Sequence, residues 1–266
     1  MKIVSQENQG VSSTRNLGIE NSSSDLIAFL DADDEWKPGF LKAILSLRKR
    51  YPDAGAYGTS YEILLRGGRV YHPKFGRIPY GWEGILSSYF RASFGLHVLH
   101  TSAVVIPKRI FEEVGGFPIG EKLGEDLDMW LRIALRFPIA YSNVEQSVYH
   151  QDAGNRTDVL PVSVDRLPYL KRAEQALRSG ILPENIRDDL IEYVATRKIG
   201  YAIGFILKSN HKVGRKILEE IETKRFASRK KLWLMLSYIP TIFLGGLRSG
   251  KRYIVSFIDS GKKKLF

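Results

Sequence analysis

The chain has 266 residues, of which 44% are hydrophobic, enough for one large domain or for one domain with an added region. Its 40 Lys and Arg residues outnumber 29 Asp and Glu residues and give a formal net charge of +11. The absence of cysteine excludes disulfides, thiol nucleophiles and cysteine-bound metals. The first residues do not have the pattern of a secretory signal, so the predicted compartment is the cytoplasm.

The first predicted elements are a short helix over residues 8–19 and a buried strand over residues 26–30. Hydroxyl residues that suit N-caps and a late glycine support the helix. The strand is apolar and ends abruptly in Asp31-Ala32-Asp33-Asp34-Glu35. A core strand that stops on a group of carboxylates predicts a cation site at its carboxyl end.

Oxygen ligands of this kind favour Mg²⁺ or Mn²⁺, which keep coordination positions open for substrate phosphates. A calcium loop of the EF-hand type starting at Asp31 is rejected, because its sixth and twelfth positions hold Trp36 and Lys42 instead of Gly and Glu. The remaining alternative is a solvated acidic turn that only caps the next helix.

A second helix is predicted from Pro38, which suits the first turn, to a stop near residue 51. The order helix, strand, acidic turn, helix predicts an α/β fold with a mostly parallel sheet. Residues 57–66 and 69–72 then predict a hairpin with a two-residue turn at Gly67-Gly68. The aromatic stretch over residues 82–100 either shapes a binding pocket or packs in the core.

Two ordered blocks carry a resemblance to a known family. Residues 10–41 read GVSSTRNLGIENSSSDLIAFLDADDEWKPGFL, and residues 104–117 and 124–134 form the second block. They resemble the nucleotide-sugar half and the acceptor half of family 2 glycosyltransferases, which have the GT-A fold. The resemblance covers roughly residues 1–150. It implies a GT-A-like mixed, mostly parallel sheet flanked by helices.

The resemblance also implies a reaction and its partners. The reaction is a metal-dependent, inverting transfer of one sugar, of the hexosyltransferase type, from a nucleoside-diphosphate sugar. The acceptor is a hydroxyl of a saccharide or a lipid-linked molecule in polysaccharide or glycolipid assembly. Enzymes of this family that polymerise long chains carry a Gln-x-x-Arg-Trp motif after the acidic pair. The chain lacks that motif, which favours a non-processive enzyme.

The donor-side residues follow from the resemblance. Asp33 matches the metal ligand, with Mn²⁺ or Mg²⁺ as the ion. Asp31 would contact the ribose or share the metal, and Arg15 would lie near the nucleotide. Asp34 either joins this group or caps the following helix. His150 lies where similar enzymes have a loop histidine near the metal or diphosphate, or else it is an ordinary hydrogen-bonded residue.

On the acceptor side, Asp126 matches the general base of the family. It begins a predicted helix, whose dipole favours the ionised carboxylate. The alternative is that Glu125 and Asp126 only complement that dipole. Glu125, Trp130 and Arg132 are placed on the acceptor side, although an ion pair between Arg132 and Asp128, four positions earlier, is an equal alternative for the arginine.

The sequence departs from the family at its start. By resemblance the chain enters the fold at the third strand and lacks the opening strand-helix-strand unit. An incomplete reading frame, a degenerate gene or a noncovalent partner would each explain this. The strand over residues 26–30 would then have an unpaired edge, and we expect weak or absent activity for this chain alone. The alternative function is a catalytically silent, membrane-associated or partner-binding fragment.

A boundary is predicted near residue 160, between a catalytic domain over residues 1–160 and a helical, basic region over residues 161–266. The expected helices there span residues 166–179, 183–207 and 211–223. From Asn210 to Phe266 there are fourteen Lys or Arg residues against four Asp or Glu residues, a net charge of +10. This charge lacks any nucleic-acid recognition motif, so nucleic acid is not a predicted partner.

Within the basic region, residues 232–247 form an apolar run with an internal proline, about sixteen residues long, against about 20 for a spanning helix. Basic flanks suit an anionic membrane surface at the inner face of the cell membrane. Packing against the catalytic domain is the alternative.

Overall fold

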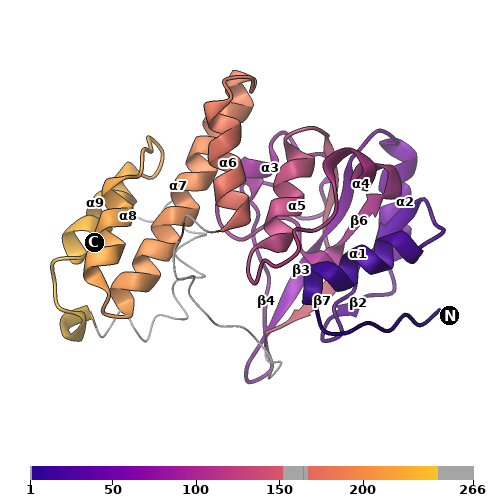
Figure 1. Cartoon of the computed structure of the whole chain (residues 1–266), viewed down its shortest axis with the longest axis horizontal. Helices are drawn as coiled ribbons and strands as arrows, with labels where there is room; N and C mark the ends of the chain where they lie inside the picture. Colours follow the sequence, from indigo (N-terminus) through magenta and orange to yellow (C-terminus); the bar gives the residue numbers. More distant parts are fainter. Residues whose placement is uncertain (1, 152–163, 165–166, 245–266) are drawn as a thin grey trace.

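The computed structural model describes residues 2–151, 164 and 167–244. An α/β unit comes first, and a row of helices extends from one side of it (Figure 1). The α/β unit contains α1 (Val11–Asn21), β1 (Leu26–Ala28), β2 (Glu35–Trp36), α2 (Phe40–Arg50), β3 (Ala56–Leu65), β4 (Arg69–Tyr71), β5 (Glu83–Ile85), α3 (Tyr89–Ala92), η1 (Thr101–Ala103), β6 (Val104–Pro107), α4 (Lys108–Val114), α5 (Glu125–Ala134) and β7 (Ile139–His150). The row contains α6 (Pro168–Arg178), α7 (Glu184–Leu207), α8 (His211–Glu219), α9 (Ala227–Leu236) and η3 (Thr241–Leu244).

The sheet has the order β1-β6-β3-β7-β2, with β4 added to β3 and β5 added to β7. The predicted α/β class and mixed sheet are confirmed, but the sheet is not mostly parallel: β3 and β7 pair in parallel, and the other described pairings are antiparallel. The order of elements correctly predicted that β1 and β3 run in one direction. It could not show that a later strand, β6, inserts between them in the opposite direction.

Local sequence explains several details. β1 lies at one end of the sheet and, among the described strands, pairs only with β6, which gives the open edge expected for residues 26–30. The hairpin of β3 and β4 is present, but Leu65 faces Arg69, so its turn has three residues and not two. Gly67 and Gly68 have φ values of 86° and 74°, which glycine adopts without strain. Pro38 lies just before α2, which begins at Phe40.

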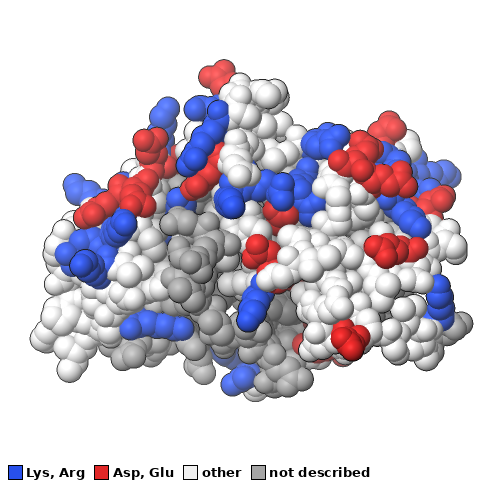
Figure 2. All heavy atoms as spheres, viewed as in Figure 1, with Lys and Arg blue, Asp and Glu red and all other residues white. Residues whose placement is uncertain are grey.

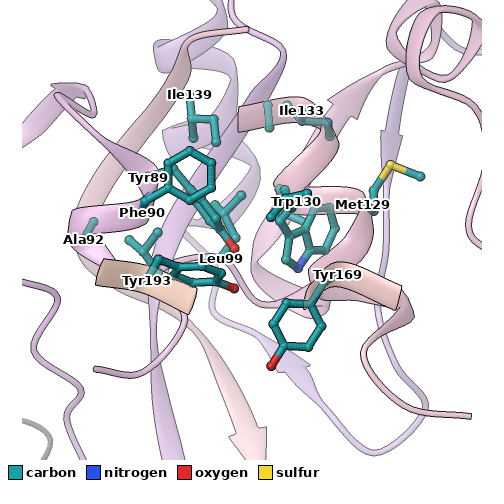
Figure 3. Close-up of a cluster of buried hydrophobic side chains, with 14 of the residues drawn as sticks. Tyr89, Phe90, Ala92, Leu99, Met129, Trp130, Ile133, Ile139, Tyr169 and Tyr193 are labelled. Atoms are coloured by element: carbon teal, nitrogen blue, oxygen red, sulfur yellow. The ribbon is translucent and has the colours of Figure 1, made fainter. Parts of the chain in front are cut away.

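Aromatic side chains from four helices fill the main core beside the sheet. Figure 3 shows Tyr89 and Phe90 of α3 packed with Trp130 of α5, Tyr169 of α6 and Tyr193 of α7. The Tyr193 ring centroid is 5.6 Å from that of Phe90 and 6.4 Å from that of Tyr169. The aromatic stretch over residues 82–100 was expected either to shape a pocket or to pack in the core. Tyr89 and Phe90 pack in the core.

The three predicted C-terminal helices are present as α6, α7 and α8. The main core includes α6 and the first part of α7, whereas a second core joins the end of α7 to α8, α9 and η3. The predicted boundary near residue 160 lies outside the described residues. Within the described chain, no helix is both long and apolar enough to cross a membrane.

A buried ion-pair network ties α5 to its neighbours. Asp128 is fully buried, and its carboxylate accepts from Arg132 Nε at 2.8 Å and from Arg172 Nε of α6 at 2.6 Å. Arg132 also donates to the carbonyl oxygens of Gly115 and Gly116 at 3.0 and 2.8 Å. This guanidinium therefore satisfies carbonyl groups at and just beyond the end of α4, and it depends on Asp128 for its countercharge.

We expect Asp128→Asn to lower the free energy of unfolding by about 3–5 kcal/mol, because Arg132 would keep a buried charge without its partner. The matched control is Glu113→Gln, since Glu113 pairs with Arg109 and Arg136 at 3.6 Å on the surface. The control should cost about 1 kcal/mol or less. Urea unfolding of both variants measures the difference, and equal losses would contradict a special role for the buried network.

Candidate active site

The acidic turn after β1 is shaped by one buried serine. The backbone N–H of Asp34 donates to the Asp31 carbonyl at 3.0 Å, which closes the turn. Ser102 Oγ, from η1, accepts from the Asp31 N–H at 3.1 Å and donates to Asp34 Oδ2 at 2.6 Å. Trp36 Nε1 donates to the Ser102 carbonyl at 2.8 Å. The segment that precedes β6 therefore fixes both ends of the turn.

Asp34 faces inward and holds the turn to the end of β7. Its Oδ1 accepts from the backbone N–H of His150 at 3.1 Å. Burial raises the pKa of Asp34, and the hydrogen bonds from Ser102 and His150 oppose that rise. The alternative role predicted for Asp34, capping α2, is wrong: in the described chain no side chain caps that helix. Both carboxylate oxygens of Asp34 accept hydrogen bonds that fix the turn.

Asp33 and Asp31 differ from Asp34 in exposure. Asp33 is exposed, and no hydrogen bond or ion pair joins its carboxylate to another residue of the described chain. The side chain of Asp31 is 37% exposed. The turn thus offers one free carboxylate at Asp33 and one at Asp31 that is engaged by an arginine.

Arg15 joins the two sequence blocks. From α1, its Nη2 lies 3.0 Å from Asp31 Oδ1 and its Nη1 lies 3.0 Å from Glu125 Oε1 at the start of α5. Its Cζ lies 5.3 Å from the ring centroid of Phe117, and its side chain is only 10% exposed. The acidic turn and the start of α5 are therefore held next to each other by Arg15.

A neighbouring asparagine positions Arg15. Asn16 Oδ1 accepts from the Phe117 N–H at 2.7 Å, and Nδ2 donates to the Phe117 carbonyl at 2.9 Å. A Cβ on Gly116 would lie 2.6 Å from Asn16 Oδ1, so this approach requires glycine. The sequence reasoning did not identify Asn16 or Ser102, because neither residue carries a signal that separates it from an ordinary polar residue.

Asp126 lies at the start of α5 beside this ion-pair group and is partly buried. The N–H of Leu127 donates to Asp126 Oδ1 at 2.7 Å. Burial, followed by the neighbouring Glu125 carboxylate, raises the pKa of Asp126 to about 6, while Arg15 and the Leu127 N–H oppose the rise. These effects outweigh the helix-dipole effect that the sequence predicted. The carboxylate is still mainly ionised at neutral pH, as expected.

Of the three other predicted site residues, His150 lies beside the acidic turn, whereas Trp130 and Arg132 point away from it. His150 Nε2 is 3.0 Å from Glu35 Oε1, and no group of three His, Asp or Glu side chains that could hold a metal occurs in the described part of the chain. Trp130 is fully buried in the main core because its place on the helix turns it inward, and its predicted acceptor-side position stays a prediction. Arg132 forms the alternative ion pair with Asp128.

Comparison with known proteins finds similar glycosyltransferases. Residues 2–115 match the model of glycosyl transferase family 2. A Rickettsia felis protein described as an uncharacterized glycosyltransferase is 26% identical over 164 residues, which are 59% of this chain and 25% of that protein. The succinoglycan biosynthesis protein ExoW of Rhizobium meliloti is 28% identical over 127 residues, 42% of this chain and 38% of ExoW.

The crystal structure of residues 1–349 of S. aureus TarS, in complex with UDP-GlcNAc, superposes with a TM-score of 0.58 at 14% identity. The match covers 99% of this chain and 76% of that structure. The fold is therefore that of GT-A glycosyltransferases. The match of residues 2–115 to glycosyl transferase family 2 agrees with the resemblance seen in the sequence. It spans about a quarter of the length of the Rickettsia felis relative.

The raised pKa of Asp126 predicts a stability effect. Its ionised form is disfavoured in the folded state, so stability should be lost as pH rises from about 4 through about 6. We expect Asp126→Asn to raise the free energy of unfolding at pH 7.5 by about 1–3 kcal/mol, and the gain should vanish near pH 4. Urea unfolding at both pH values measures this. A gain of equal size at both would contradict it.

Proposed function

We propose that this protein transfers one sugar from a nucleoside-diphosphate sugar to an acceptor hydroxyl, with inversion at the anomeric carbon. The observation that carries this proposal is the Arg15 bridge, which brings the acidic turn and the start of α5 into one site. A donor-binding group and a proton acceptor must lie within the same site for direct transfer. The match of residues 2–115 to glycosyl transferase family 2 supports the same reaction class.

Asp126 is proposed as the general base. The acceptor oxygen attacks the anomeric carbon as its proton moves to the Asp126 carboxylate, and the bond from that carbon to the diphosphate oxygen breaks. The leaving group is the nucleoside diphosphate. A base with a pKa of about 6 is ionised at neutral pH, yet it is more basic than an ordinary aspartate. Among the described residues, none donates a hydrogen bond to its second carboxylate oxygen, Oδ2.

The donor would be held by the acidic turn and Arg15. Asp33 is the proposed ligand of Mn²⁺ or Mg²⁺, with Asp31 contacting the ribose or sharing the ion. An exposed carboxylate without a protein partner fits this role, because such ions are often held by one or two carboxylates plus substrate phosphates. When bound, the ion would neutralise charge on the departing diphosphate. His150, paired with Glu35, would approach it only after breaking that contact.

The proposed acceptor is a saccharide or a lipid-linked molecule in polysaccharide or glycolipid assembly, used at the inner face of the cell membrane. Names of relatives such as ExoW, a succinoglycan biosynthesis protein, support this class of acceptor. The alternative function is a silent fragment that keeps the architecture without the reaction. Nucleotide affinity and turnover distinguish the two functions.

We expect Asp126→Asn to reduce sugar transfer at least a thousandfold while nucleotide affinity changes little, because the amide cannot accept the proton. Transfer by the unaltered chain should fall below about pH 6 as the carboxylate becomes protonated. Release of nucleoside diphosphate with and without acceptor measures both effects. Glu112→Gln, at an exposed position of α4, is the control. A variant that retains normal transfer would exclude Asp126 as the base.

Asp33→Ala should weaken Mn²⁺-dependent binding of a nucleoside diphosphate at least tenfold, because the ion would lose its protein ligand. Calorimetry with UDP, GDP and ADP, each with and without Mn²⁺, tests this prediction. The same titrations show which nucleotide base the site prefers. The control is Asp53→Ala, an exposed aspartate in the turn after α2. If the unaltered chain folds but binds no nucleotide under any condition, the silent-fragment alternative is favoured.

A further inference from the structure

The C-terminal end of the described chain carries exposed apolar side chains that the proposed reaction does not use. We call them the apolar ridge, and its members are Leu232, Met235, Tyr238, Ile239, Ile242 and Phe243. Ile242 and Phe243 are 82% and 77% exposed. Scattered single apolar residues are ordinary on a protein surface. Six within twelve positions form a patch of the kind that marks an interaction site.

The ridge continues along the outer side of α9. The inner side of this helix packs against the second core through Trp233 and Leu236. Leu232 and Met235 lie three residues apart on α9, which places them on one side of the helix, and Tyr238 and Ile239 follow just beyond its end. Residues 232–236 are all apolar, yet α9 has no buried residue. A helix that is apolar on both sides is expected to be buried on both sides, so a further surface is expected to pack against the outer side of α9.

Cationic side chains lie beside the ridge. The Arg215 guanidinium carbon is 3.5 Å from the ring centroid of Tyr238, and Arg215 Nη2 donates to the Ser237 carbonyl at 3.0 Å. His211 Nε2 lies 2.5 Å from Thr241 Oγ1. The N-terminal end of α8, which also carries the exposed Lys212, therefore adjoins the ridge.

Acidic side chains gather at the opposite end of this helix pair. Glu219 ends α8, and Glu220 and Glu222 follow it; here Lys230 Nζ, near the start of α9, donates to the Ile221 carbonyl at 2.6 Å. In Figure 2 the lower left edge of the visible face is largely free of charged side chains, and both basic and acidic side chains lie above it. The ridge therefore adjoins Lys212 and Arg215 at one end of the helix pair, and the exposed Lys231 precedes its first member, Leu232.

We infer that the apolar ridge docks on an anionic lipid bilayer, with Ile242 and Phe243 entering the interface and Lys212, Arg215 and Lys231 facing the headgroups. Such a surface supplies both an apolar layer and negative charge, which is the combination that the ridge and its flanks require. This inference names the residues that would contact the membrane at the proposed location. It does not depend on the transfer reaction.

A second copy of this chain fits the ridge less well. A symmetric dimer through the ridge would place the same cationic flanks opposite each other, and like charges at an interface oppose association. A bilayer with anionic lipids has the opposite sign of charge. Dimerisation through the ridge is therefore an outcome of the test that would overturn the inference.

The experiment is co-sedimentation of the full chain with vesicles of phosphatidylcholine alone or mixed with phosphatidylglycerol. We expect binding to the anionic vesicles that weakens with added salt, and at least tenfold weaker binding of Ile242→Asn/Phe243→Asn. The matched control is Ile119→Asn/Ile181→Asn, which changes two isoleucines that are 68% and 85% exposed elsewhere. The control should bind like the unaltered chain.

Each other result would overturn the inference. Equal vesicle binding by the ridge variant and the unaltered chain would show that the ridge does not contact lipid. A lowered melting temperature of the ridge variant with unchanged vesicle binding would indicate that the ridge is covered within its own chain. A dimer in analytical ultracentrifugation that this variant abolishes, without vesicle binding, would indicate a second copy. Nucleotide affinity, measured separately, reports on the transfer reaction alone.

Discussion

The site depends on one constraint: carboxylates from distant parts of the chain are held together by a single buried cation. Arg15 contacts Asp31 and Glu125, which are 94 positions apart in the chain, and it opposes the rise in the pKa of Asp126. Without this charge, three neighbouring carboxylates would repel one another in a partly buried place. Asn16 and the Phe117 backbone fix the helix that carries it.

Other buried polar residues fix the two segments that Arg15 joins, the acidic turn and the start of α5. Ser102 and Asp34 fix the acidic turn from its inner side, which leaves Asp33 exposed. Asp128 and Arg132 fix α5 against the end of α4, so the position of Asp126 is set by a buried network. Polar groups that do no chemistry in the proposed reaction thus determine where the reacting groups lie.

The two hydrophobic cores divide the molecule at a different place from the boundary predicted near residue 160. Aromatic residues of α6 and the first part of α7 complete the core beside the sheet, so these helices belong physically to the α/β unit. The end of α7, α8, α9 and η3 form a smaller core that leaves the apolar ridge on its surface. Composition located the basic region, but it could not divide one long helix between two cores.

The sequence by itself determined the α/β class, the acidic turn after an apolar strand, the C-terminal helices and the resemblance to family 2 glycosyltransferases, because these depend on local periodicity and on residue types at fixed spacing. It also gave two open alternatives that the contacts resolved, at Asp34 and Arg132. Only the tertiary structure decided the insertion of β6, the inward position of Trp130, the roles of Ser102 and Asn16, and the raised pKa of Asp126. Each of these depends on burial or on a partner far away in the chain, and neither is encoded in local pattern.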